Sequence, residues 1–187
     1  MTRALAVEGG GTMRNSLVVS ISALSLASLQ CGGGESPGAG VTSGYDPCAL
    51  ITEADAEAAV SVDLVNEVHD TTAQNATGQK LCFYADPNDT LKMVQLGINE
   101  QASMGGGLTA ERLYADMRDL LDSEVPVSDV GDEAFWGGRG LQAGSGLWVL
   151  MRDKGVILSV LVGDPALSDA AVLAAEKALA ATATGRL

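Results

Sequence analysis

The sequence predicts a single α+β domain, with an antiparallel sheet of about six strands, helices gathered on one side and the order α-βββ-α-βββ-α. Runs of segments with strand patterning alternate with single segments of helical periodicity, which is typical of an antiparallel sheet covered by helices. Residues 45–187 form this domain. A chain of about 140 residues is long enough to bury roughly two-thirds of its unfolded surface in one core.

Three segments have helical patterning. Thr52 precedes residues 53–60 and forms a capping box with Asp55. Thr109 begins a second helix, whose apolar positions 113, 117, 120 and 121 recur at helical spacing and which Pro126 ends. An alanine-rich helix follows a cap at 168 or 169 and runs to about residue 184, with positions 172, 175, 179 and 183 on its packing face.

The strands are predicted from alternation and from short apolar runs between turn residues. Apolar residues at 94, 96 and 98 alternate with polar or small residues at 95, 97 and 99, so one face of that strand is buried. The strongest signal is the hairpin of residues 147–152 and 156–162, joined by a tight turn. The remaining expected strands are residues 62–68, 80–84, 127–130 and 134–136.

Residues 1–30 are interpreted as a signal segment. Arg14 precedes an apolar run at 17–29 that has the length of a signal peptide and is too short to span a bilayer. The glycine-containing stretch before it fits neither a signal nor a folded element, so we expect translation to begin at Met13.

Cys31 follows the apolar run and begins a glycine- and serine-rich tether over residues 31–44. This placement predicts lipid attachment at Cys31, although Gln30 departs from the small residue that usually precedes such a cysteine. The alternative is ordinary cleavage near Ala27, which releases a soluble secreted protein. We therefore expect an exported envelope protein that is anchored to the membrane through a lipid on Cys31.

The charge and the cysteines restrict the partners further. The chain carries 24 acidic and 11 basic residues, a formal net charge of −13, and no basic stripe, so nucleic acid is a poor partner. If Cys31 is acylated, Cys48 and Cys82 remain to form a disulfide. Closing the loop between them should stabilise the folded domain by roughly 3 to 4 kcal/mol. Two buried free thiols are the alternative. A metal site is disfavoured because there is one histidine and no second cysteine pair.

Three short motifs resemble a known family. They are Asp-Pro-Cys-Ala-Leu-Ile-Thr at 46–52, Cys82 followed by Phe83 and Tyr84, and Gly-Asp-Glu-Ala-Phe-Trp at 131–136 before a hydrophobic hairpin. Together they are similar to a family of actinobacterial cell-envelope lipoproteins of unknown function. The resemblance implies an anchored, disulfide-bearing α+β domain and brings no catalytic residues.

A candidate ligand site surrounds the glycine-rich stretch at 137–146. Phe135, Trp136 and Trp148 flank this stretch and Arg139 lies within it. Aromatic side chains beside a flexible loop can form a binding mouth, but the simpler interpretation, which we prefer, is that both tryptophans fill the core.

We expect a non-enzymatic binding or interaction role, with a small-molecule or protein partner and without a cofactor. The alternative is a hydrolytic enzyme with an unrecognised acid pair. The single histidine and the lack of a clear nucleophile or metal motif disfavour it.

Overall fold

The computed structural model describes residues 44–69 and 77–187, with the backbone alone for residues 66–69. The predicted signal segment, Cys31 and nearly all of the tether lie outside the described residues. Those that are described belong to one compact unit. Within this part of the chain no helix combines the length and the apolar character needed to cross a membrane.

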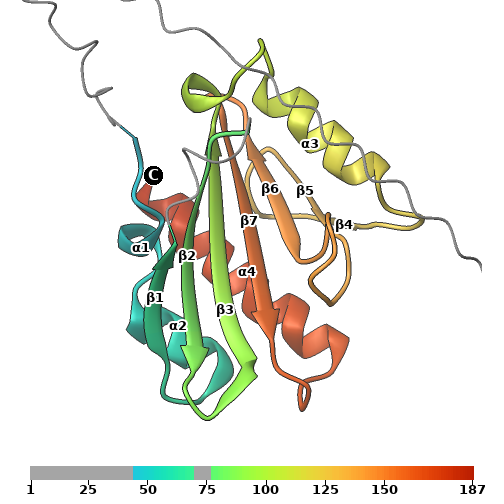
Figure 1. Ribbon diagram of the computed structural model, residues 1–187. Coiled ribbons are helices and arrows are strands. Elements are labelled where there is room, and N and C mark those ends of the chain that lie inside the picture. The colour runs from blue at the N-terminus through green and yellow to red at the C-terminus, as the bar shows by residue number, and fades with distance from the viewer. Residues whose placement is uncertain (1–43, 70–76) are drawn as a thin grey trace, which may run out of the picture. The chain divides into compact units, whose positions relative to one another are not determined.

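The fold is built on one antiparallel sheet of seven strands in the order β1-β2-β3-β7-β6-β5-β4. Two meanders, β1 to β3 and β4 to β7, meet where β3 pairs with β7 at the centre (Figure 1). The strands are β1 (Val65–His69), β2 (Gln79–Asp86), β3 (Asp89–Glu100), β4 (Val125–Val127), β5 (Glu133–Trp136), β6 (Leu147–Met151) and β7 (Val156–Gly163). The predicted α+β class with an antiparallel sheet is confirmed, with seven strands where about six were expected, each overlapping a segment predicted as a strand.

The helices cover both faces of the sheet. The helices α1 (Pro47–Leu50), α2 (Glu53–Val60) and α4 (Asp169–Arg186) pack with Val149 and its neighbours in the main core. The helix α3 (Ala110–Asp119), which follows a 3-10 turn at Gln101–Ser103, packs instead with Trp148 and Leu150. Because successive strand residues point to opposite faces, α3 lies on the other side of the sheet.

The expectation that all helices gather on one side is therefore wrong for α3. The physical reason lies in β6 and β7, which are almost continuously apolar and buried along their length. A strand that is apolar on both faces needs cover on both. The helix α3 provides that cover for the second face of β6 and β7.

Two helix details also differ from the prediction. In α4 the buried positions include Glu176, whereas Ala175 is half-buried. The helix α3 ends at Asp119, which leaves Leu120 60% exposed. Pro126 does not end this helix but lies within β4, an edge strand, where a missing N–H breaks no pairing with a further strand.

The predicted disulfide between Cys48 and Cys82 is present and joins α1 to β2. The two Cα atoms are 5.2 Å apart, and Cys82 is fully buried. Near the bridge, the Tyr84 hydroxyl donates a hydrogen bond of 2.6 Å to the carbonyl oxygen of Ile51. Burial raises the pKa of Tyr84 to about 12. Disulfides persist in oxidising compartments, so the bridge favours an extracytoplasmic environment.

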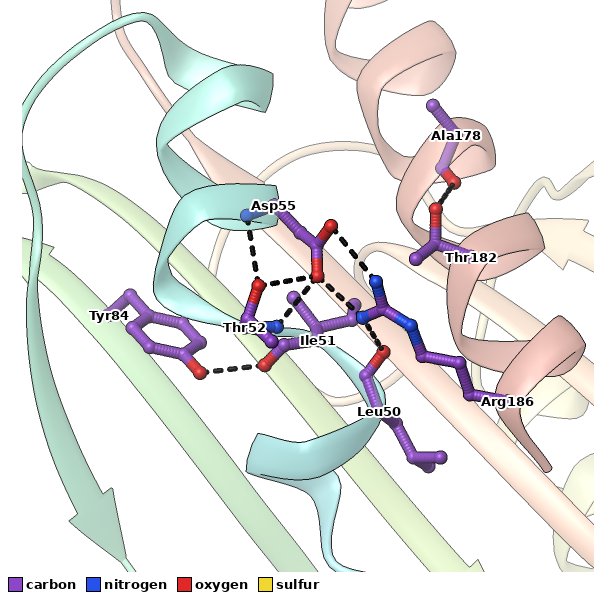
Figure 2. A network of polar contacts seen from close by, with 8 residues as sticks. All are labelled: Leu50, Ile51, Thr52, Asp55, Tyr84, Ala178, Thr182 and Arg186. Carbon is purple, nitrogen blue, oxygen red and sulfur yellow. Dashed lines mark hydrogen bonds and ion pairs between the residues drawn. The ribbon is translucent and has the colours of Figure 1, made fainter.

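The C-terminal end of α4 is clamped to the start of α2 (Figure 2). The guanidinium of Arg186 donates to the carbonyl oxygen of Leu50 at 2.8 Å and to both carboxylate oxygens of Asp55, at 2.5 and 3.2 Å. Asp55 also completes the predicted capping box with Thr52. The hydrogen bond from Arg186, followed by that from the Thr52 N–H, holds the pKa of Asp55 well below its ordinary value of 3.8. The two helices are thus fixed to each other over the main core.

Candidate functional site

The loop at 137–146 joins β5 to β6 and is closed at its base. The Gly137 N–H donates to the carbonyl oxygen of Gly146, and the Gly146 N–H donates to the carbonyl oxygen of Gly138. Both N···O distances are 2.9 Å. Gly146 has a φ of 79°, and a Cβ there would lie 2.4 Å from the carbonyl oxygen of Val160. Glycine is therefore required at this position. The tip is open to solvent, with Leu141 77% exposed.

Arg139 ties the loop to the connection between β7 and α4. Its guanidinium donates to the carbonyl oxygens of Leu167, at 2.9 Å, and Asp164, at 2.5 Å. The carboxylate of Asp169 lies 3.7 Å away. Arg139, predicted as a candidate ligand contact, is thus engaged in positioning the loop.

The three aromatic residues predicted to form a mouth do not come together. Phe135 and Trp148 lie on the α3 face, with parallel rings whose centroids are 6.2 Å apart. Trp136 points to the opposite face, toward α4. Both tryptophans are only 8% exposed and Phe135 is 1% exposed, so the three aromatics do not form one mouth; Trp136 packs in the main core, whereas Trp148 also borders a cavity beside the loop. The loop itself still borders two cavities.

The first cavity, which we name the glutamine cavity, lies between the loop, α3 and the second face of the sheet. Its volume is about 310 Å³, at the lower end of the range of small-molecule sites. Its polar lining consists of Gln79, Gln95, Gln142, Ser145 and Ser159. Its remaining wall is formed by Met117, Trp148, Leu161 and the other residues of 140–144.

Gly97 lets two of the polar side chains of this cavity approach each other. Gly97 pairs with Ser159 of β7, and a Cβ on Gly97 would lie 2.3 Å from the Ser159 hydroxyl oxygen and 2.9 Å from the Gln79 amide nitrogen. The two polar side chains therefore converge over a position that has no side chain. The Gln79 amide also donates to the Asn99 side-chain oxygen at 3.4 Å.

Ser145 is the side chain that distinguishes the glutamine cavity from ordinary packing. It is 8% exposed, and its hydroxyl is one of the few buried polar groups in the described residues without a hydrogen-bond partner. The backbone oxygen of the same residue accepts the indole N–H of Trp148 at 3.0 Å. Buried polar groups are normally paired, so an unpaired hydroxyl at a cavity wall calls for a functional explanation.

No residue with a charged side chain lines the glutamine cavity, although the chain has a net charge of −13. The buried carboxylate of Glu176 is on the other face of the sheet, packed beneath Trp136. Among the residues that the structure describes, no group of histidine, cysteine, aspartate and glutamate side chains could hold a metal ion. What the glutamine cavity offers is neutral hydrogen-bonding groups.

No protein-family model, curated protein or solved structure matches this chain. The resemblance to envelope lipoproteins therefore stays a prediction from its motifs.

The glutamine cavity is hard to predict from the sequence. Its polar residues come from β2, β3, β7 and the loop, and are brought together by pairing between distant strands. The one local signal is the polar alternation at 95, 97 and 99, which marks the second face of β3. Nothing in the sequence indicates that α3 and the loop partly enclose that face.

Proposed function

We propose that this protein is a non-enzymatic binding protein whose glutamine cavity holds an uncharged small molecule rich in hydroxyl or amide groups. The observation that carries the proposal is a cavity lined by amides and hydroxyls without a charge, in which the buried hydroxyl of Ser145 has no partner. Each glutamine amide both donates and accepts hydrogen bonds, so this lining is complementary to the hydroxyl and amide groups of a ligand, which do the same. A charged ligand would lose its hydration without gaining a counter-charge.

We propose further that the domain works outside the cytoplasm, anchored to a membrane through a lipid on Cys31. The disulfide between Cys48 and Cys82 supports an oxidising compartment. The charged flank, the apolar run and the tether around Cys31 support export and anchoring. In this arrangement the glutamine cavity samples neutral solutes of the envelope.

The two tryptophans give a direct test, because they lie on opposite faces of the sheet. In the ¹⁵N-labelled protein, two indole N–H signals are expected, and Trp136→Phe assigns them. Glucose, N-acetylglucosamine, myo-inositol and N-methylacetamide are the neutral probes; glutamate and inorganic phosphate are the charged ones. A neutral probe should shift the signal of Trp148, whose indole N–H donates to Ser145 at the cavity wall, more than that of Trp136.

A serine pair controls this experiment. Ser145→Ala should weaken binding of the neutral probe at least tenfold while leaving the melting temperature unchanged or slightly raised, because it removes an unpaired buried hydroxyl. Ser123→Ala, at an exposed position, should change neither. Equal shifts of both indole signals, or stronger binding of the charged probes, would contradict the proposal.

A further inference from the structure

A second cavity, which we name the leucine cavity, lies on the other side of the loop tip. Its volume is about 230 Å³. Its apolar walls come from the start of β3, the end of β7 and the loop: Leu91, Met93, Leu141, Leu161 and Pro165. It is therefore chemically unlike the glutamine cavity, although both are formed by the same loop and the same sheet face.

The two cavities are adjacent. Gly140, Leu141 and Leu161 line both of them. Gly140 has a φ of 117°, which fits glycine and leaves no side chain at this shared position. A ligand that reaches past these three residues would contact both cavities.

The leucine cavity is also where the domain leaves apolar side chains most exposed. Leu141 is 77% and Leu91 is 65% exposed, the two highest values among the large apolar residues of the described chain. Single exposed leucines are ordinary, but two that flank one cavity form an apolar patch. Both are positioned to cover an aliphatic group.

The charged residues at this cavity are already engaged. Arg139 donates to the carbonyl oxygens of Leu167 and Asp164, and the Asp164 carboxylate accepts the N–H of Ala166 at 2.8 Å. Arg139 also lies 3.7 Å from the Asp169 carboxylate, and Asp164 is only 6% exposed. The leucine cavity thus favours apolar contact.

We infer that the natural ligand is a neutral amphiphile, with a hydroxyl- or amide-rich head in the glutamine cavity and a short aliphatic chain in the leucine cavity. This inference rests on the proposed function, because the head occupies the site proposed above. It adds the chemical class of the ligand and the direction in which the ligand lies. The aliphatic chain of the ligand extends from the head near Ser145 past Leu161 toward Leu91.

The test is a homologous series of methyl, butyl, hexyl and octyl β-D-glucosides, with glucose and hexanol as references, all below their micelle-forming concentrations. Calorimetric titration gives the affinity, and the Trp148 indole signal reports occupation of the glutamine cavity. Affinity should rise about fourfold for each methylene that becomes buried, and then level off once the leucine cavity is full. Hexyl glucoside should bind better than either glucose or hexanol.

Matched leucine variants localise the effect. Leu91→Ser should abolish the dependence on chain length while keeping the affinity for methyl glucoside, since the Leu91 side chain is 65% exposed, contributes little to folding and does not line the glutamine cavity. Leu120→Ser is the control, because Leu120 is 60% exposed and lines neither cavity. Its chain-length dependence should equal that of the wild type.

The possible failures of the two proposals are distinguishable. If the head binds and shifts the Trp148 signal but affinity is independent of chain length, the amphiphile inference is overturned and the proposed function stands. If hexanol binds as tightly as hexyl glucoside without shifting the Trp148 signal, or if no member of the series binds, the glutamine cavity does not hold a neutral head and the proposed function itself fails.

Discussion

Glu176 is a carboxyl group buried between α4 and the sheet. One carboxyl oxygen accepts the N–H of Val162 at 2.9 Å, and the Trp136 indole lies close enough to Glu176 to affect its pKa. Val162 lies two residues beyond Val160, the last residue of β7 that pairs with β6 at this end. The glutamate thus satisfies a strand N–H that β6 does not reach. Burial is the dominant effect and raises the pKa of Glu176 to about 8.

This pKa predicts a stability that falls as the pH rises. The folded protein holds the proton up to about pH 8, whereas the unfolded chain releases it near the ordinary value of 4.5. The folded state therefore binds more protons between these values, and the free energy of unfolding decreases across that window. Glu176→Gln keeps an acceptor for Val162 and removes the titration. Its melting temperature relative to wild type should rise steadily from pH 5 to pH 8.

Thermal denaturation at several pH values measures this difference. Glu111→Gln, at an exposed position on α3, is the control and should leave the pH profile of the wild type unchanged. A difference between Glu176→Gln and wild type that stays constant from pH 5 to pH 8 would show that Glu176 does not titrate in this window.

At the scale of elements, the bridge between Cys48 and Cys82 fixes α1 to β2. The short helix α1 has four residues, too few to be stable by itself. Cross-linking residues 34 positions apart restricts the unfolded chain, so the Cys48→Ala, Cys82→Ala double variant should lose roughly 3 to 4 kcal/mol of stability. Urea denaturation measures the loss. An unchanged midpoint after reduction of the wild type would refute this role.

How far the elements follow from the sequence depends on what each segment contacts. The hairpin of β6 and β7 and the cap of α2 are local features, and both were predicted. The burial of Glu176 in place of Ala175 was not, because its compensation is a hydrogen bond to a strand in another part of the chain. Leu120 was expected to pack with α3, but the helix ends before it.

The glutamine cavity was less predictable than the fold. Its location depends on the register that places Gly97 opposite Ser159, which no local pattern specifies. The sequence did indicate the loop and its neighbour Trp148, and both border the cavity. It misplaced Phe135 and Trp136, because alternation along β5 sends adjacent aromatics to opposite faces.

At the scale of the whole molecule, the predicted anchor decides where the domain works. Cys31→Ser should move the protein from the detergent phase to the aqueous phase, or leave its signal segment unprocessed. Each buried methylene of a lipid contributes about 0.8 kcal/mol, so the separation should be clear. Phase partitioning followed by mass spectrometry of the N-terminal peptide measures it. Wild-type protein in the aqueous phase would mean that the chain is secreted without a lipid.

The pairing of β3 with β7 also determines the order in which the chain can fold. The meander of β1, β2 and β3 needs contacts between neighbouring segments alone, so it can form early. The centre of the sheet joins residues 93–100 to residues 156–163 and has to wait for most of the chain. Until β7 arrives, the inner side of β3 is an open edge that can pair with another molecule. The last part of the sequence therefore closes an edge that would otherwise stay open to pairing between molecules, as well as completing the core.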